Sequence, residues 1–354
     1  MKTTTVVFPE QDRVEVQQVE VDEVKANQVK VVTNRSLIST GTERKCLQQD
    51  FAPGGAWEEW VQYPFNAGYC AAGEVIEVAA EIRGVAVGER LAGFGAHRKH
   101  TVFDVHHMVK IPDDISYEEA AWFPLAAIVQ YGFRHAKLEL GETVVVVGLG
   151  MLGQLCVQYA RLAGAAEVIA IDQSKWRLDL AQNGGATHCL ACGVADAVDA
   201  VRDITEGKMA DVLYEAAGPA EVFAPCQRLL GNFGRLVSLG DSGHAERQSM
   251  TEGFSTRNLT LIGANNDIAP LTAWPHSRSG KVFMKLLQRG DMNVKDLITH
   301  RFPVQQAAAA YKLLLGKREE AMGVIFTYGD ASHRVSENRE CPMSARNLLP
   351  ISNR

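Results

Sequence analysis

The spacing of hydrophobic residues divides the chain into two parts with different secondary structure. Over the first 115 residues, short apolar runs such as residues 29–32 are separated by frequent glycine and proline. Short strands with closely spaced turn residues are typical of an all-β, barrel-like unit. From residue 143 onward, apolar runs alternate with helical patterns, which indicates a doubly wound α/β domain around a parallel sheet.

The second part begins with residues 143–147, Thr-Val-Val-Val-Val, an uninterrupted apolar run of the kind that is buried on both faces of a sheet. Leu152, Leu155 and Tyr159 follow at helical spacing. Just before this part, residues 116–119 have capping-box spacing and predict a helix that Pro124 breaks or kinks. The further predicted strands are residues 168–171, 211–214, 235–238, 259–262 and 323–327, and the further predicted helices lie near residues 174–182, 220–230, 279–289 and 304–315.

Composition and charge exclude several classes of protein. With 46% hydrophobic and 22% charged residues over 354 positions, the chain is neither disordered nor fibrous, and its length predicts about two domains. The net charge of −6 has the wrong sign for a nucleic-acid binder. No apolar run is long enough for a membrane span or a signal peptide, and the seven cysteines predict free thiols. We therefore expect a cytoplasmic enzyme with a small-molecule substrate and with no membrane or nucleic-acid partner.

A glycine-rich turn follows the first strand of the second part. Its sequence, Gly148-Leu-Gly150-Met-Leu-Gly153, is a G-x-G-x-x-G motif between a strand and a helix, the context in which this motif binds a dinucleotide. Gly148 permits the tight turn, Gly150 lets the backbone approach a pyrophosphate, and Gly153 allows close packing of the helix. The alternative is a glycine-rich turn in an unrelated α/β domain.

The next strand ends at Asp172, 22 residues beyond Gly150. A carboxylate there accepts hydrogen bonds from the adenosine ribose and repels a 2′-phosphate, so the sequence favours NAD over NADP. Lys175 and Arg177 leave NADP as an alternative. We assign to the cofactor site Gly148, Leu149, Gly150, Met151, Leu152, Gly153, Asp172, Gln173, Arg177, Ala216, Ala217, Gly218, Leu239 and Gly240.

Motifs along most of the chain resemble the medium-chain dehydrogenase/reductase superfamily, over residues 5 to 328. The matching segments are residues 39–43 (Ser-Thr-Gly-Thr-Glu), 68–75, 87–91, 109–112, 143–172 and 214–218. Residues 38–44, together with Gly68 and Tyr69, are similar to a subgroup that includes the bacteriochlorophyllide hydroxyethyl dehydrogenase and sugar- or polyol-dehydrogenase-like relatives.

The resemblance implies a GroES-like β-barrel domain and a Rossmann domain. We place the GroES-like domain at residues 1–125, completed by residues 271–330, and the Rossmann domain at residues 126–270. Residues 331–354 are polar and without periodicity, and we expect a loose tail there. The resemblance also implies a homodimer or homotetramer formed through the edge strand at residues 259–262.

The chain departs from the zinc-dependent members of that superfamily at the metal ligands. The resemblance places Thr40, Tyr69 and Phe123 at the three ligand positions, and none of these is a usual zinc ligand. Residues 89–111, where a structural zinc would need four cysteines, contain none. We expect no zinc, and we expect the histidines at positions 97, 100, 106 and 107 to lie on the surface or in strands.

Without zinc, a side chain must handle the proton of the alcohol. The resemblance implies that Thr42 relays this proton, with a local turn hydroxyl as the alternative. Tyr69 is a candidate general acid if a neighbouring cation or the charge of the cofactor lowers its pKa, with simple space filling as the alternative. Glu43 is a candidate that orients these groups.

Two aromatic groups are candidates for the substrate pocket, with an apolar interface as the alternative. Their residues are Trp57, Trp60, Trp274, His276 and Arg278. We expect a zinc-independent, NAD-dependent oxidoreductase that interconverts a secondary alcohol and a ketone on a sugar-, polyol- or cyclitol-like substrate. The alternatives are an NADPH-dependent quinone or enoyl reductase and a dinucleotide-binding protein without catalysis.

Overall fold

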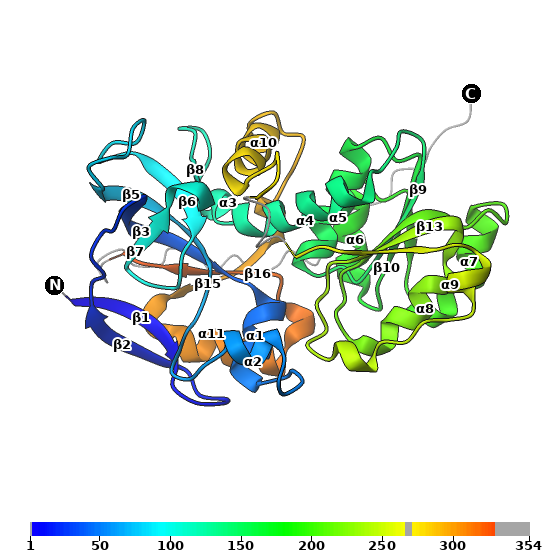
Figure 1. Ribbon diagram of the computed structural model, residues 1–354, viewed down its shortest axis with the longest axis horizontal. Helices are drawn as coiled ribbons and strands as arrows, with labels where there is room; N and C mark the ends of the chain where they lie inside the picture. Colours follow the sequence, from blue (N-terminus) through cyan, green and yellow to red (C-terminus); the bar gives the residue numbers. More distant parts are fainter. Residues whose placement is uncertain (1, 266–270, 330–354) are drawn as a thin grey trace, which may run out of the picture.

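The computed structural model describes residues 2–265 and 271–329, which form three sheets and the helices around them (Figure 1). The tail expected at residues 331–354 lies outside these residues. The helices longer than one turn are α1 (Thr40–Gln48), α2 (Ala56–Trp60), α4 (Phe123–Ala136), α5 (Met151–Leu162), α6 (Lys175–Gly184), α7 (Val198–Ile204), α8 (Phe223–Arg228), α10 (His276–Gln288) and α11 (Ala307–Gly316). None of the described helices is long and apolar enough to cross a membrane.

A six-stranded parallel sheet forms one half of the molecule, as the sequence predicts. In spatial order its strands are β11 (His188–Leu190), β10 (Glu167–Ile171), β9 (Thr143–Val147), β12 (Ala210–Glu215), β13 (Leu230–Ser238) and β14 (Thr260–Gly263). Val144 and Val146 of β9 belong to the core under α4 and α5, whereas Val145 and Val147 belong to the core under α7 and α8. Burial on both faces explains the uninterrupted apolar run.

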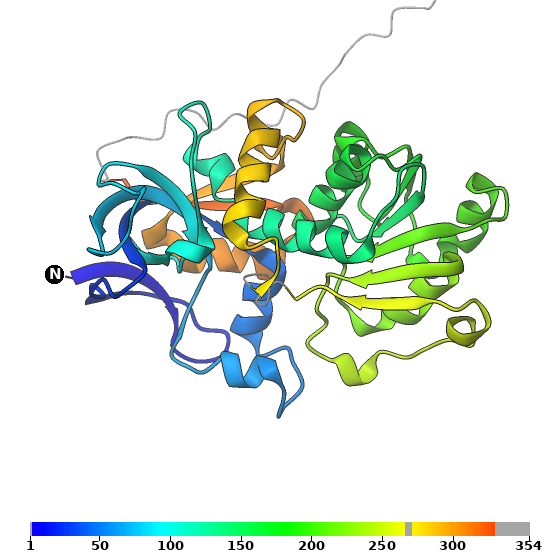
Figure 2. The ribbon, with the colours of Figure 1, turned by 45° about the horizontal axis from the view of Figure 1, so that its top comes forward.

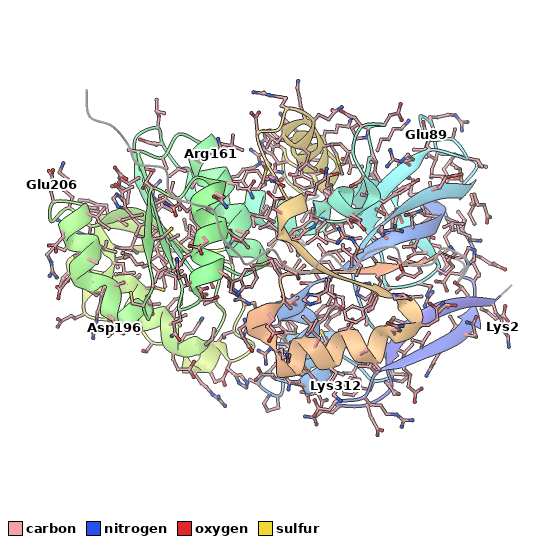
Figure 3. All side chains as sticks on the ribbon, turned by 180° about the vertical axis from the view of Figure 1, so that it is seen from behind. Lys2, Glu89, Arg161, Asp196, Glu206 and Lys312 are labelled. Carbon is pink, nitrogen blue, oxygen red and sulfur yellow. The ribbon has the colours of Figure 1, made fainter. Side chains whose placement is uncertain are left out.

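The other half is built from antiparallel strands, except that β15 and β16 pair in parallel. The larger sheet runs β15 (Ile298–Pro303), β16 (Gly323–Thr327), β3 (Gln28–Ile38), β5 (Cys70–Val78), β6 (Arg90–Phe94) and β8 (Met108–Lys110), with β7 (His100–Asp104) paired to β3. The smaller one is β2 (Glu15–Glu20), β1 (Lys2–Phe8) and β4 (Phe65–Asn66). Residues near the end of the chain therefore pair with β3, near its beginning. Figure 3 shows Lys2 and Glu89 on this half and Asp196 and Glu206 at the far end of the other.

The two halves meet around α4 and α10 (Figure 2). Ser116 forms the predicted capping box with Glu119 and begins α3 (Tyr117–Ala120). The helix stops there, and α4 starts afresh with Pro124 in its first turn, where a missing N–H costs nothing. Phe123 and Phe283 are fully buried in the core that joins α4 to α10.

The expectation of strands and turns alone over the first 115 residues is wrong at two places, because α1 and α2 are helices. The chain leaves β3 at Ile38 and turns directly into α1. The side chain of Glu43 accepts a hydrogen bond from the backbone N–H of Ser39, one of the amides left unpaired at a helix start. Helix α1 carries Thr42, Glu43 and Lys45, and it therefore determines the geometry of the site.

Candidate active site

The glycine-rich turn has the close contacts that its sequence predicts. Gly148 has a φ of +84°, and a Cβ there would lie 2.6 Å from Cα of Ala217. A Cβ on Gly153 would lie 1.9 Å from the carbonyl oxygen of Gly148. Gly150, at the N-cap of α5, has no atom within 4 Å of the corresponding position. Two glycines thus allow close packing, and the third leaves open space before the helix N-terminus.

The residues around the turn come from the ends of three adjacent strands. Ala216 donates its N–H to the carbonyl of Val147 at 2.9 Å, and Leu239 and Gly240 donate to the carbonyl of Glu215. A Cβ on Gly240 would lie 2.6 Å from the backbone nitrogen of Gly218. The structure therefore brings residues 216–218, 239 and 240 together with the turn. Leu149 and Met151 are buried, and Leu152 is partly buried.

Asp172 lies beside the same turn. Its two carboxylate oxygens accept hydrogen bonds from the backbone N–H groups of Leu149 at 2.7 Å and Ser174 at 2.8 Å. Gln173 is exposed. Arg177 donates to the carbonyl of Arg318 at 2.8 Å, and Lys175 pairs with Asp179 at 3.0 Å. Both basic side chains that left room for NADP thus have partners within the chain.

Arg318 is a residue that sequence reasoning missed. The pKa of Arg318 is lowered, first by desolvation and then by Arg44 and Arg177, whereas the charge of Asp172 opposes this. Two further arginines and Asp172 therefore lie near Arg318. Arg44, Arg318 and Asp172 are far apart in the sequence, and no local motif marks the group.

Tyr69 lies among hydroxyl groups at the start of α1. Its OH donates a hydrogen bond to Oγ of Ser39 at 2.7 Å. Burial raises the pKa of Tyr69, and hydrogen bonds with Ser39 and Thr42 oppose this only in part. No lysine or arginine is among the described groups that shift this pKa, so of the two conditions for a general acid only the charge of a bound cofactor is left. Tyr69 therefore stays neutral and acts as a hydrogen-bond donor.

Glu43 is buried at the centre of a hydrogen-bonded network. One carboxylate oxygen accepts from the N–H of Ser39 at 2.7 Å. The other accepts from the OH of Tyr311 and lies 3.0 Å from Nε2 of His97. His97 is fully buried, so the expectation of a surface or strand histidine is wrong for this residue. Glu43 holds the start of α1 in place and does not face open space.

Aromatic rings connect Tyr69 to α10. Phe94 stacks on Tyr69 with ring centroids 6.3 Å apart and on His276 at 4.6 Å. The Nδ1 atoms of His276 and His107 are 2.6 Å apart. A cavity of about 400 Å³ opens on this side, lined by Gln28, Phe94, Val102, Asp104, His107 and His276. His276, predicted for the substrate pocket, is thus joined to Tyr69 through one ring.

The other aromatic candidates are separate. Trp57 stacks on Phe51 and lies 5.4 Å from Nζ of Lys45, and Trp60 is half exposed beside it. In the described part of the chain, no ring contact joins this pair to Trp274. The guanidinium groups of Arg134 and Arg278 cover Trp274, at 3.2 Å and 3.6 Å from its ring centroid. The expectation that Trp274 offers an aromatic face to a sugar ring is therefore wrong.

The three positions expected to lack zinc ligands have side chains that do not suit zinc. Thr40 directs its hydroxyl to the sulfur of Met151 at 3.6 Å, Tyr69 donates to Ser39, and Phe123 packs edge-on against Phe94. Within residues 2–265 and 271–329, no three His, Cys, Asp or Glu side chains lie close enough together to hold a metal ion. These residues do not fit a catalytic zinc.

Lys45 of α1 and Glu215 of β12 are two buried ionisable side chains that sequence reasoning also missed. Lys45 is only 8% exposed, and its Nζ lies 3.8 Å from the position of a Cβ on Gly218. Burial lowers the pKa of Lys45 and raises that of Glu215 to about 7. Oε1 of Glu215 accepts from Ala217 and Gly218, but the buried Oε2 has no hydrogen-bond partner. A cation from one half thus lies at the strand ends of the other.

Comparison with known proteins adds three kinds of similarity. A family model described as zinc-binding dehydrogenase matches residues 152–266. D-guloside 3-dehydrogenase of Escherichia coli (strain K12) is 26% identical over 302 residues, which cover 79% of this chain and 85% of that protein. Sorbitol dehydrogenase of Bacillus subtilis (strain 168) is 24% identical over 296 residues, covering 75% and 81%.

A crystal structure of galactitol-1-phosphate dehydrogenase from Escherichia coli superposes with a TM-score of 0.79 at 20% identity, covering 92% of this chain and all of that one. An alcohol dehydrogenase from Escherichia coli CFT073, complexed with NADH, superposes with a TM-score of 0.75 at 17% identity, covering 92% and 99%. At these identities the likeness shows the fold.

Proposed function

The chain belongs to the medium-chain dehydrogenase/reductase superfamily, and on that premise we propose that it interconverts a secondary alcohol and a ketone with NAD. The observation that carries the proposal is the position of α1. Thr40 contacts Met151 at the start of α5, and Lys45 lies beside Gly218. These contacts hold the hydroxyl group of Tyr69 beside the glycine-rich turn.

The residues around the turn fit a nicotinamide dinucleotide. Open space at Gly150 lies before the N-terminus of α5, where backbone N–H groups and the helix dipole favour a pyrophosphate. Asp172 has the position of an acceptor for the adenosine ribose. When bound, the cofactor supplies the hydride acceptor or donor.

The chain itself handles the proton. Tyr69 is neutral, and when a ketone substrate binds, its one O–H turns from Ser39 to the substrate oxygen and stabilises the negative charge that develops there. In the reverse direction Oη receives the proton of the alcohol while its own proton passes to the hydroxyl of Ser39 or Thr42, which releases its proton to water. Glu43 and His97 are positioning residues, because they hold Ser39 and the start of α1. No step in this scheme uses zinc.

We propose a sugar, polyol or cyclitol as the substrate. The similarity to D-guloside 3-dehydrogenase and sorbitol dehydrogenase supports a polyhydroxylated molecule. Imidazole side chains of His107 and His276 beside the ring of Phe94 offer hydrogen bonds and an apolar surface to such a molecule.

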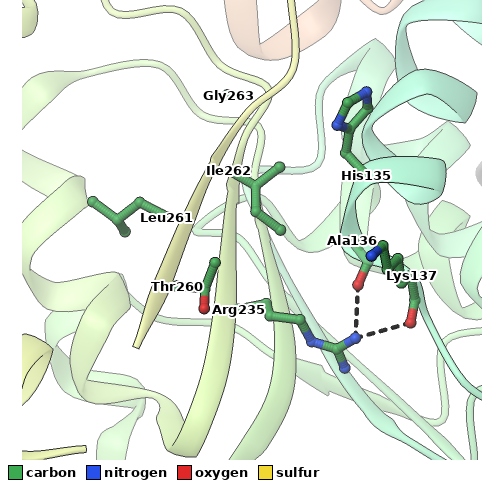
Figure 4. A pocket seen from close by; sticks show the side chains of 8 residues that line it. All are labelled: His135, Ala136, Lys137, Arg235, Thr260, Leu261, Ile262 and Gly263. Atoms are coloured by element: carbon green, nitrogen blue, oxygen red, sulfur yellow. Dashed lines mark hydrogen bonds between the residues drawn. The ribbon is translucent and has the colours of Figure 1, made fainter. Parts of the chain in front are cut away.

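We also propose that a second copy of the chain pairs along β14, to give a homodimer or homotetramer. Strand β14 is at the edge of the parallel sheet, where backbone groups on one side pair with no other strand of the described residues. A cavity of about 450 Å³ lies along it, lined by residues 135–137, Arg235 and residues 260–263 (Figure 4). Arg235 donates to the carbonyls of Ala136 and Lys137 and fixes one wall of this cavity.

The test is a turnover assay with the purified protein on sugars, polyols and cyclitols, followed by the absorbance of the reduced nicotinamide. We expect activity with NAD that persists after zinc has been removed, with the residual zinc content of the protein measured as a check. Turnover only of activated alkenes with NADPH would favour the reductase, and tight dinucleotide binding without any turnover would favour a non-catalytic protein. Activity that requires stoichiometric zinc would contradict the scheme above.

NADP is the second candidate cofactor, because Arg318 lies near Asp172 and has Arg44 and Arg177 as neighbours. These positive charges would attract a 2′-phosphate, whereas the carboxylate of Asp172 would repel it. We expect NAD to bind at least tenfold more tightly, since Arg177 is held by backbone carbonyls. In Asp172→Ser this preference should shrink or reverse in a calorimetric titration, and an unchanged preference would contradict the role of Asp172.

A further inference from the structure

Trp274 has a guanidinium group on each face of its ring. The central carbon of the Arg134 guanidinium lies 3.2 Å from the ring centroid, and that of Arg278 lies 3.6 Å from it. Two such groups would overlap on one face, so they occupy opposite faces, and their central carbons are at most 6.8 Å apart. We call Arg134, Trp274 and Arg278 the Arg–Trp–Arg stack.

Neither arginine of the stack is paired with a carboxylate in the described ranges. Arg134 donates to the side-chain oxygen of Gln130 at 3.1 Å, and Arg278 donates to the carbonyl of Ala273 at 2.7 Å. The buried Nε of Arg134 has no hydrogen-bond partner. By contrast, Arg289 just past the other end of α10 pairs with Asp291 at 2.8 Å. The stack therefore holds two positive charges that its own surroundings do not neutralise.

The two charges repel each other. Burial lowers the pKa of Arg134, and the charge of Arg278 lowers it further. An arginine remains protonated in proteins despite such shifts, so the repulsion persists in the free protein. An anion that contacts both guanidinium groups would relieve it and would form charge-assisted hydrogen bonds with each.

The stack is held in one geometry before any ligand arrives. Gln130, the partner of Arg134, donates from its side chain to the OH of Tyr159 at 3.0 Å and to the carbonyl of Ser279 at 2.9 Å. These bonds tie α4 to α5 and α10. A guanidinium that is already oriented loses less conformational entropy when it binds a ligand.

The stack lies beside the proposed reaction site. Trp274 and Arg278 are each two residues from His276, whose ring stacks on Phe94. Arg134 comes eleven residues after Phe123 on α4, and at 1.5 Å per residue this is about 16 Å along the helix. The stack therefore extends the substrate pocket away from Tyr69.

We propose that the Arg–Trp–Arg stack binds the phosphate group of a small phosphate monoester. A phosphate dianion offers three oxygens and two charges, enough to accept hydrogen bonds from two planar guanidinium groups at once. A carboxylate carries one negative charge and would neutralise only one of the two arginines. The inference stands whether or not the oxidoreductase function is correct.

The test is a calorimetric titration of the full chain with inorganic phosphate at constant ionic strength, in the presence of saturating NADH. NADH occupies the N-terminus of α5, so phosphate that would bind at this helix end does not contribute to the measured heat. We expect saturable binding that weakens at least tenfold in Arg134→Gln and in Arg278→Gln. Arg278→Lys, which keeps the charge but loses the planar fork, should show an intermediate affinity.

Arg289→Gln is the matched control, because it removes a charge next to the same helix but outside the stack. Its phosphate affinity should equal that of the wild type. No saturable binding to the wild type, or an equal loss in Arg289→Gln and Arg278→Gln, would overturn the proposal. Thermal midpoints of the variants show that each remains folded.

A parallel titration with glycerol phosphate identifies the source of the phosphate group. We expect tighter binding of the monoester than of inorganic phosphate, and weaker binding would overturn the assignment to a monoester. Should NADH fail to bind at all, the proposed function fails, while the comparison of the arginine variants still tests the stack.

Discussion

Tyr69 is the residue whose surroundings matter most for the proposed reaction. We expect it at the position of a metal ligand in zinc-dependent relatives, and it donates to Ser39 and contacts Thr42. A phenol with a raised pKa stays protonated, so its O–H is available to donate to an oxygen that gains negative charge. Its role is therefore to stabilise charge on the substrate oxygen.

Replacing Tyr69 tests this role directly. Tyr69→Phe keeps the ring that stacks on Phe94 and removes only the hydroxyl. We expect kcat to fall about a hundredfold or more, with the Kd for NADH unchanged. A variant that keeps wild-type kcat would show that Tyr69 only fills space.

Glu43 is expected to contribute to stability more than any exposed carboxylate. The two carboxylate oxygens of Glu43 are bonded to Ser39, Tyr311 and His97. In Glu43→Gln the side-chain amide keeps only one acceptor oxygen for these groups. Leaving a buried donor unpaired costs about 1–3 kcal/mol. Chemical denaturation measures this loss, and Glu10→Gln, which breaks an exposed ion pair with Arg13, is the control with an expected change below about 1 kcal/mol.

Glu215 should make stability depend on pH. Burial raises its pKa to about 7, above the value near 4.5 that it has when exposed. The folded state therefore binds the proton more tightly, and this stability is present at low pH and is lost as the pH rises from about 4.5 to about 7. We expect the free energy of unfolding of the wild type, measured relative to Glu215→Gln, to fall across this window, and a constant difference would contradict the assignment.

For single residues, the sequence predicted which residues belong to the cofactor site better than it predicted which side chains are buried and what they contact. Gly148, Gly153 and Asp172 follow from a local motif, and the structure brings them together. The buried states of His97, Lys45 and Glu215 depend on contacts between residues far apart in the chain. No local pattern encodes such contacts.

The glycine-rich turn shows, at the scale of elements, how one motif combines two separate requirements. Gly153→Ala places a methyl group 1.9 Å from the carbonyl of Gly148, so the start of α5 must move away from β9. Gly150→Ala places the methyl group in open space at an ordinary φ of −71°. The first change strains the free protein, and the second obstructs only a ligand.

The two substitutions should therefore differ in a measurable way. We expect Gly153→Ala to lower the thermal midpoint of the free protein and to weaken NADH binding. Gly150→Ala should leave the midpoint of the free protein unchanged while weakening NADH binding at least tenfold. Equal effects on the free protein would contradict this division of roles.

Elements of the parallel sheet could be predicted well because burial on both faces leaves a plain apolar run. Strand β9 of this sheet has the predicted bounds, and so does β16 of the other half. Helix α1 was missed because its first turn, Thr-Gly-Thr, disfavours a helix and the whole segment has no clear apolar stripe. Its start is stabilised by Glu43 and its packing by α11, which are tertiary contacts.

At the scale of the whole molecule, the two halves differ in how they use the chain. The parallel sheet is built from one continuous stretch, β9 to β14, whereas the antiparallel sheet includes β15 and β16 from near the end of the chain. Phe326 of β16 is fully buried against the rings of His97 and Tyr311. The end of the chain thus supports the network that holds α1.

Phe326→Ala tests whether the halves are stable independently. Removing a buried phenylalanine costs about 3–5 kcal/mol, and this loss should fall on the antiparallel half. In hydrogen exchange we expect faster exchange in β3 and β16, with β9 and β12 protected as in the wild type. Uniform acceleration in both halves would show a single cooperative unit instead.

The place of β16 between β15 and β3 also has a consequence for biosynthesis. β16 begins at Gly323, 285 residues after β3 ends at Ile38. While the chain emerges from the ribosome, the edge of β3 that will receive β16 stays without its neighbour until almost all of the described chain has been made. The parallel-sheet half can fold first, and the nascent antiparallel half must be kept from pairing with other chains, so this protein should depend on chaperones for its first domain more than for its second.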